Sequence, residues 1–236
     1  MKKQIYTLLI LLFFGISLYA QPKAVSEPKI VAKMNEPFRT PVWSSDGAKL
    51  FLTSLKNNGL WEVSSNGTNF KMISAEIGAG NQLKTMTTNR TNPLLQQMID
   101  NPAKVTSQVK ELQSLSGCLI FNPALSPTGD KIVFQASNGK GLCVCNADGS
   151  ELRQLGKGER ATWTPDGKYI VVMITADNGD VVTKGELISI NVSSGTRNTL
   201  LSSDKYIALS PAISPDGTKI AFEEYASGAI YVMNIK

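Results

Sequence analysis

A short phrase occurs four times in the chain and constrains its fold more than any other feature. The copies begin at Pro41, Pro123, Ala161 and Pro211, and the last copy is PAISPDGTKIAF. In each copy, two β-favouring runs flank a turn that contains glycine. Proline and aspartate suit the central positions of a type I turn, and glycine accepts the left-handed conformation that follows. Each copy therefore predicts a β-hairpin.

The turn residues have a structural role that needs no chemistry. Two copies depart from the pattern without a change of register: Thr128 replaces the turn aspartate and Asp130 follows the glycine in one, and Ser45 replaces proline in the other. The predicted structural turn residues are Asp46, Gly47, Gly129, Asp166, Gly167, Asp216 and Gly217.

Further β-favouring runs follow each hairpin. A third run follows every copy (GLWEVSSNG, GLCVCNADG, GELISINVSSG and GAIYVMNI), and a fourth run follows three of them (NFKMIS, ELRQL and TRNTLL). Each unit is thus a four-stranded meander of roughly 40 residues, which is the period of a propeller blade. The sequence predicts an all-β fold, a β-propeller of four-stranded antiparallel blades.

The spacing of the turn glycines indicates about five blades, one of them degenerate. The interval from Gly47 to Gly129 is about twice the intervals between the later turns, so a degenerate blade is expected between about residues 75 and 122, with NQLKTMTTN as its inner strand. A sixth blade is possible only if the same interval hides another.

Part of this interval has the pattern of helices. Pro93 and Pro102 each follow an asparagine that can cap a helix, and apolar residues recur at helical spacing from Val105 to Leu115. We expect a helical insertion at about 83–117. Its apolar face either packs on the propeller or serves as a lid or a partner-docking helix.

The two ends of the repeat region complement each other. The last repeat ends at AIYVMNIK, a third strand without a fourth, while the segment Lys29–Lys33 has no blade of its own. We expect this N-terminal segment to supply the outer strand of the last blade, which closes the ring and removes exposed strand edges.

The repeat resembles that of a known family. The phrase SPDGTKIAF followed by AIYVMN is similar to the WD40-like PD40 repeat of TolB-like β-propellers, which also occurs in the propellers of prolyl-oligopeptidase-like peptidases. The resemblance implies an envelope protein that binds other proteins and is not an enzyme. The peptidases that carry such propellers need a separate hydrolase domain.

The beginning of the chain predicts export. Lys2 and Lys3 precede an apolar run that breaks after Ala20, as in a secretory signal peptide. We expect a signal peptide at 1–20 and a single propeller domain at 21–236, in the periplasm or secreted. The alternative is a retained membrane anchor, in which case the protein would be a sensor ectodomain. The formal charge falls from +5 to +3 without the two lysines, which does not favour nucleic-acid binding.

The chain contains no histidine. This excludes Ser-His-Asp triads, Cys-His dyads and histidine-ligated metals, and we expect no catalytic residue, metal or cofactor. A carbohydrate- or peptide-active propeller that uses carboxylates stays open as an alternative. The segment Ala176–Asp180 is too short for a calcium loop and is interpreted as a solvated connection.

The three cysteines have two interpretations. Cys143 and Cys145 lie two apart on one predicted strand and so point to the same face. The first interpretation makes them and Cys118 small buried core residues. The second is a disulfide between Cys118 and one of the pair in an oxidising compartment.

One mouth of the propeller is expected to be basic. Loops from each fourth strand to the next inner strand open on the same face as the loops between second and third strands, while the hairpin turns with Asp46, Asp166 and Asp216 lie opposite. These charges are either scattered and solvated, or they receive an acidic segment of an envelope protein or an anionic envelope polymer. The predicted partner-binding residues are Arg39, Lys56, Asn57, Lys140, Lys157, Arg160, Lys205 and Tyr206, with Asn58 and Asn138 in the same loops.

We predict that Gly167→Val or Gly217→Val destabilises the fold. A β-branched residue in a left-handed conformation carries strain of about 1–2 kcal/mol. Thermal melts of both variants check this, and unchanged melting temperatures would mean that these glycines are not left-handed.

Overall fold

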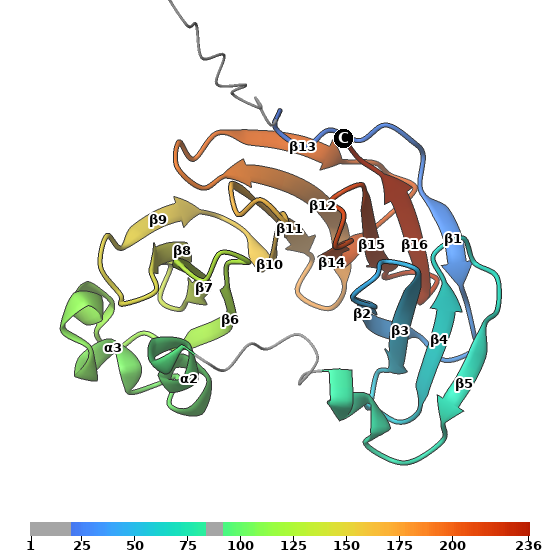
Figure 1. Ribbon diagram of the computed structural model, residues 1–236, viewed down its shortest axis with the longest axis horizontal. Coiled ribbons are helices and arrows are strands. Elements are labelled where there is room, and N and C mark those ends of the chain that lie inside the picture. The colour runs from blue at the N-terminus through green and yellow to red at the C-terminus, as the bar shows by residue number, and fades with distance from the viewer. Residues whose placement is uncertain (1–19, 84–91) are drawn as a thin grey trace, which may run out of the picture.

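The protein is built from four antiparallel sheets arranged around a common centre (Figure 1). The computed structural model describes residues 20–83 and 92–236. The strands in chain order are β1 (Lys29–Ala32), β2 (Phe38–Trp43), β3 (Lys49–Ser54), β4 (Leu60–Ser64), β5 (Lys71–Ser74), β6 (Ile120–Leu125), β7 (Lys131–Ala136), β8 (Gly141–Asn146), β9 (Arg153–Gly156), β10 (Glu159–Trp163), β11 (Tyr169–Asp177), β12 (Val182–Asn191), β13 (Arg197–Leu201), β14 (Ala208–Ile213), β15 (Lys219–Glu224) and β16 (Ala229–Asn234).

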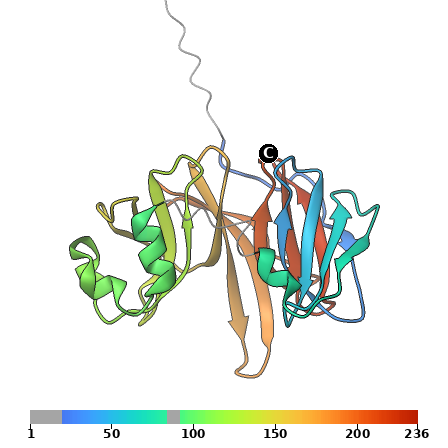
Figure 2. The ribbon, with the colours of Figure 1, turned by 60° about the horizontal axis from the view of Figure 1, so that its bottom comes forward.

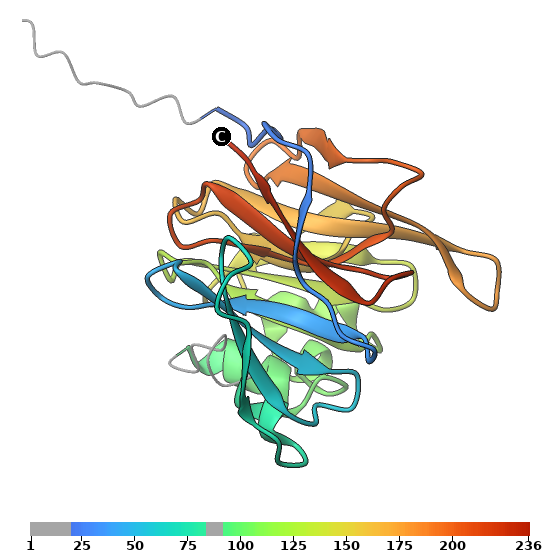
Figure 3. The same cartoon turned by 90° about the vertical axis from the view of Figure 1, so that its right-hand side faces the viewer.

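The sheets are the four blades that the repeats predict. The first blade is β2-β3-β4-β5, the second β6-β7-β8-β9 and the third β10-β11-β12-β13. The fourth has the order β1-β16-β15-β14, so the N-terminal strand pairs antiparallel with the last strand of the chain, as predicted (Figure 3). The strands of the repeated phrase, β2, β6, β10 and β14, are the innermost strands (Figure 1).

The core lies between neighbouring sheets. Phe38, Leu50 and Leu52 of the first blade are almost fully buried in one cluster with Ile230 and Val232 of the fourth. A second cluster joins the third and fourth blades, and a third cluster joins the second and third. Burial of these apolar faces is the main favourable term that holds one blade against the next.

The interval assigned to a degenerate fifth blade contains helical segments in place of strands, as far as it is described. The segments are η1 (Ala79–Asn81), α2 (Pro93–Asp100), α3 (Val105–Gln108) and η2 (Lys110–Leu115). They lie between β5 and β6 (Figure 1). The proposed inner strand NQLKTMTTN begins in η1, and its remainder from residue 84 lies outside the described residues. The ring of sheets therefore has one sector in which the described residues form no sheet.

The helix signals were partly correct. Asn92 caps α2, because its side chain accepts a hydrogen bond from the Leu95 N–H and Pro93 occupies the first turn. The prediction of a helix start at Pro102 was wrong: Asn101 ends α2, and α3 begins only at Val105. A proline two residues after a helix end is the usual stop signal, so Pro102 terminates one helix and does not begin the next.

The helical insertion packs on the open face of the second blade. Leu95, Met98 and Leu112 are almost fully buried in one cluster with residues of β6, β7 and β8. Cys118, Cys143 and Cys145 belong to this cluster as free, buried thiols, which confirms the first interpretation of the cysteines. The insertion thus replaces the cover that another sheet would provide.

The third blade has a long hairpin. Strands β11 and β12 have 9 and 10 residues, and their connection projects beyond the other blades (Figure 2). Asp177 and Asn178 accept hydrogen bonds from the following backbone N–H groups, and the connection is exposed.

No group of metal-binding side chains occurs among residues 20–83 and 92–236.

The hairpin turns follow the predicted chemistry. Gly47, Gly129, Gly167 and Gly217 all have φ between 67° and 77°. In the last turn, Asp216 Oδ1 accepts hydrogen bonds from Ser214 Oγ at 2.5 Å and from the Thr218 N–H at 3.0 Å. Asp46 and Asp166 accept equivalent bonds in their own turns.

The irregular turn of the second blade has similar hydrogen bonds, although its aspartate stands at a different position. Asp130, which follows the glycine, accepts hydrogen bonds from the hydroxyl groups of Thr128 and Ser126. The carboxylate has moved along the turn but still binds the first serine. This explains why the departure from the repeat does not disturb the register.

We predict that Asp216→Asn loses part of the acid sensitivity of folding. Hydrogen bonds from Ser214 and Thr218 lower the pKa of the Asp216 carboxyl to about 2. Because the pKa in the folded state lies below the unfolded value, the carboxylate stabilises the protein above about pH 4, and this contribution disappears as the pH falls towards about 2.

The measurement is urea unfolding of wild type and Asp216→Asn between pH 7 and pH 2. The variant should be less stable at pH 7, and the gap should shrink in acid. Asp204→Asn, in an exposed loop, is the control for removal of a charge. A gap that is independent of pH would contradict the assigned role.

We also predict that Val31→Asp is far more damaging than Ile30→Asp. On β1, Val31 is 8% exposed and packs in the cluster between the first and fourth blades, whereas its neighbour Ile30 is 50% exposed. A buried, unpaired carboxylate costs on the order of 3 kcal/mol or more. Thermal melts of the two variants test this, and equal melting temperatures would mean that β1 does not contribute to the core.

Candidate functional site

Each inner strand has the same irregularity. The pairing of β2 with β3 shifts between Arg39 and Val42, and the other three inner strands have a shift at the corresponding place. One residue of each bulge is left-handed although it is not glycine, with φ of 45° to 48°. These residues are Thr40, Asn122, Arg160 and Ser210. Such strain persists only where the surroundings hold it in place.

In three blades the left-handed residue binds the preceding blade in the ring. The Thr40 N–H donates to Glu223 Oε2 of the fourth blade at 3.1 Å. The Arg160 N–H donates to Gln135 Oε1 of the second blade at 3.3 Å. The Ser210 N–H lies 3.3 Å from the Met173 sulfur of the third blade. Each acceptor is the fifth residue of its strand, β15, β7 or β11.

A second set of contacts repeats at the same junctions. Trp43 Nε1 donates to the Ala212 carbonyl of the fourth blade, and Trp163 Nε1 donates to the Ala124 carbonyl of the second. At the hairpin turns, a Cβ on Gly217 would lie 3.2 Å from Cδ of Pro165 in the preceding blade. The three occupied junctions therefore share the contact of the left-handed residue, and two of them add a tryptophan hydrogen bond.

The fourth junction, between the first and second blades, is open. Among the described residues, no side chain of the preceding blade accepts the Asn122 N–H, and the only side-chain bond of Asn122 is to Gln135 of its own blade. A Cβ on Gly129 would meet nothing within 4 Å. On the other side, Thr53 stands where the other blades have Glu223, Gln135 and Met173. Its hydroxyl donates to the Gly59 carbonyl, and the backbone of Gly80 lies against it. Thr53 therefore does not bridge the junction.

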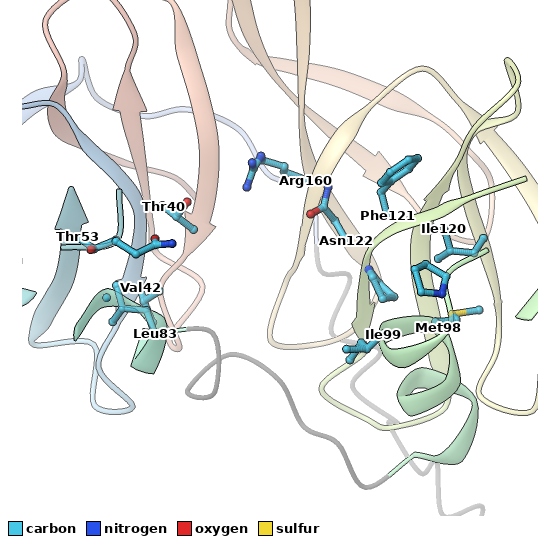
Figure 4. A pocket seen from close by; sticks show the side chains of 14 residues that line it. Thr40, Val42, Thr53, Leu83, Met98, Ile99, Ile120, Phe121, Asn122 and Arg160 are labelled. Atoms are coloured by element: carbon cyan, nitrogen blue, oxygen red, sulfur yellow. The ribbon is translucent and has the colours of Figure 1, made fainter. Parts of the chain in front are cut away.

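A cavity of about 470 Å³ occupies this open junction. Figure 4 shows Thr40, Val42 and Leu83 on one wall, Ile99 and Met98 on the other, and Arg160 between them. The residues that line it are Thr40, Val42, Thr53, Asn57, Gly80, Leu83, Met98, Ile99, Pro102, Ile120, Phe121, Asn122, Pro123 and Arg160.

The cavity combines apolar walls with one positive charge. Phe121, at the start of the bulge, is 45% exposed, which is unusual for a phenylalanine next to the centre of a fold. Arg160 is the one ionisable residue among the described residues that line the cavity. A concave apolar site with a few polar groups is typical of binding sites.

Gln135 fixes the two polar groups of the cavity relative to each other. Its Oε1 accepts from Asn122 Nδ2 at 2.8 Å and from the Arg160 N–H at 3.3 Å. The second and third inner strands are thereby tied together at the point where both face the cavity.

Two of the predicted partner-binding residues meet in the cavity, namely Asn57 and Arg160. Arg39 lies nearby, but its guanidinium is 3.8 Å from the buried carboxylate of Glu223. Tyr206 is half-buried in an aromatic cluster with Phe222 and Tyr231, so its ring has a packing role.

The other predicted residues lie in separate loops. Lys56 and Asn58 are in the β3–β4 loop, Asn138 and Lys140 in the β7–β8 loop, and Lys157 and Lys205 in the loops that lead to β10 and β14. Two of them support their own loops. The Asn58 side chain accepts from the Gly78 N–H, and the Asn138 side chain donates to the Gly117 carbonyl. The structure does not gather these six residues into one site.

Sequence reasoning missed Asn122, Thr40 and Phe121. The signal was present, because each residue lies one or two positions before a repeated phrase, and the copies at Pro41, Pro123 and Pro211 have a polar residue directly before proline. Alignment of the four copies places Asn122 with Thr40 and Ser210. Asn122 differs from the other two only because no side chain of the preceding blade accepts its N–H in the described part of the chain, and the sequence does not show this directly.

The chain is similar in sequence to a TolB homolog over about half of its length. No model of a known protein family matches the sequence. A protein TolB homolog of Chlorobium luteolum (strain DSM 273 / BCRC 81028 / 2530) is 29% identical over 136 residues, which cover 55% of this chain and 29% of that protein. The chain therefore spans less than a third of the length of this curated relative.

Solved structures that resemble the chain include two TolB proteins. One, assigned as TolB from Agrobacterium tumefaciens, has 19% identity and a TM-score of 0.40, and covers 86% of this chain and 60% of that one. TolB from Acinetobacter baumannii has 20% identity and a TM-score of 0.38, and covers 89% and 43%. The chain is thus similar in sequence to a TolB homolog, and its repeated four-stranded blades are those of a WD40-like β-propeller.

Proposed function

We propose that this protein is an exported, non-enzymatic TolB-like propeller that acts as a protein-interaction module in the cell envelope. It binds an extended segment of an envelope protein or peptide in the cavity of the open junction. The similarity to a TolB homolog supports the general class. The segment of chain assigned to the signal peptide lies almost entirely outside the described residues, so export rests on the sequence pattern.

The observation that carries this proposal is the open junction. At three junctions, a neighbouring blade covers the inner strand and accepts the N–H of its left-handed residue. At the fourth, Phe121 and Asn122 of β6 are exposed at a cavity instead. The surface that a blade would cover is available to a polypeptide, which has the backbone groups and side chains that such a surface binds.

The site favours binding over catalysis. Carboxylate-pair chemistry needs two carboxyl groups that flank a substrate, and the described residues that line the cavity include none. The structure contains no helix in its described part that is long and apolar enough to cross a membrane.

We predict that peptides selected on the full chain lose affinity when Phe121 is changed to alanine. A phage library that displays random dodecapeptides is selected on immobilised protein, and the enriched peptides are synthesised with a fluorescent label for anisotropy titrations. Loss of the exposed ring should weaken binding about tenfold, or about 1.4 kcal/mol.

The matched control is Leu119→Ala. Leu119 is 43% exposed, lies two residues from Phe121 and does not line the cavity. Thermal melts show whether both variants fold. A library without enriched peptides, or peptides that bind both variants alike, would contradict a peptide site in the open junction.

A further inference from the structure

The chain contains its own example of what can occupy an inner-strand junction. Between the fourth and first blades, the carboxylate of Glu223 accepts the Thr40 N–H at 3.1 Å and lies 3.8 Å from the Arg39 guanidinium. Its side chain is only 4% exposed. A left-handed backbone N–H and an arginine from the inner strand thus hold a buried carboxylate, and hydrogen bonds to an ionised group are stronger than those to a neutral one.

The open junction has the same two donors without the acceptor. Asn122 is the counterpart of Thr40, with φ of 48°, and its N–H has no acceptor in the described part of the chain. Arg160 supplies the guanidinium from the neighbouring inner strand and lines the same cavity. In residues 20–83 and 92–236, no carboxylate forms a salt bridge with Arg160.

The charge of the site distinguishes a carboxylate from a neutral acceptor. The other two junctions use the amide of Gln135 and the sulfur of Met173. Arg160 donates its backbone N–H to Gln135, whereas its side chain lines the cavity of the open junction. The open junction has Arg160 and no negative lining residue in its described part. A neutral acceptor would leave this charge without a partner, whereas a carboxylate would satisfy both the guanidinium and the N–H.

We infer that the open junction is a carboxylate-binding site, in which the Asn122 N–H and the Arg160 guanidinium bind a carboxylate of a peptide partner. The inference rests on the proposed function and adds the chemical group that is recognised. Gln135 is a positioning residue, because it binds the Asn122 side chain and the Arg160 backbone and holds the two donors together. The carboxylate belongs either to an acidic side chain or to a chain terminus.

The Asn122 backbone amide is a direct reporter for the test. The full chain is labelled with ¹⁵N and titrated with Ac-Gly-Ser-Glu-Ser-Gly-amide, with its glutamine analogue, and with the glutamine analogue that has a free C-terminal carboxylate. We expect the Asn122 amide proton to shift downfield with at least one carboxylate peptide, and at least tenfold weaker binding of the fully neutral one. Comparison of the first and third peptides identifies which kind of carboxylate is preferred.

Two variants distinguish direct contact with the carboxylate from the overall positive charge of the protein. Arg160→Gln should weaken binding of the preferred carboxylate peptide at least tenfold. Lys104→Gln removes an exposed positive charge two residues from Pro102, outside the lining of this cavity, and should change binding less than twofold. The ¹⁵N spectra of both variants also show whether the fold is intact.

The outcomes separate this inference from the proposed function. Equal shifts with charged and neutral peptides, no shift at peptide concentrations of about 10 mM, or an equal effect of the two variants would overturn the carboxylate site. Selected dodecapeptides that still depend on Phe121 would then leave the peptide-binding function in place. An equally large shift with inorganic phosphate would overturn the assignment to a carboxylate in favour of a general anion site.

Discussion

The hydrogen bond that crosses from one inner strand to the preceding blade is the contact on which this architecture depends. Apolar burial between sheets is strong but has no direction, so it does not by itself fix the angle between two blades. The N–H groups of Thr40, Arg160 and Ser210 provide that direction, because each must meet one side chain at one position. The left-handed strain at these residues is thereby offset at every occupied junction. At Asn122 it is not offset by any such bond in the described residues, which makes this residue the natural point of attachment for another molecule.

The two faces of the open junction are protected in different ways. On the second blade, Leu95, Met98 and Leu112 of the helical insertion are almost fully buried in one cluster with residues of the sheet. On the first blade, η1 and Leu83 cover a smaller cluster with Val42 and Leu60. Helices can replace a sheet as an apolar cover, since burial depends on area and not on the kind of secondary structure. They do not replace the inner strand, and for this reason a cavity forms at the centre and not at the rim.

The sequence predicted most of the fold because each repeat contains local signals for its own strands and turns. Turn glycines, alternating strands and the N-terminal strand β1 are local signals, and the structure confirms them. The end of the insertion's first helix at Asn101 was harder, because the same Asn-Pro pair can start a helix or stop one. The candidate site was the least predictable. The predicted partner-binding residues include Arg160 and Asn57, which line the cavity, but also Tyr206, whose ring packs internally, and Arg39, which is paired with Glu223. A pattern of charges along the chain does not show which cation already has a partner in the fold.

The buried thiols that pack against the helical insertion can report on its opening. Burial raises the pKa of Cys143 to about 11 and that of Cys145 to about 12, so at neutral pH both are held as the unreactive thiol. Alkylating reagents attack the thiolate and must also reach it, and both conditions are met when the helices lift from the second blade. The rate of alkylation under native conditions therefore reports how often these thiols become exposed. A ligand that occupies the cavity beside α2 would slow this alkylation if it holds the helices on the sheet. The cysteines are therefore an internal probe of occupancy, and α2 itself contributes only apolar side chains to the cavity wall.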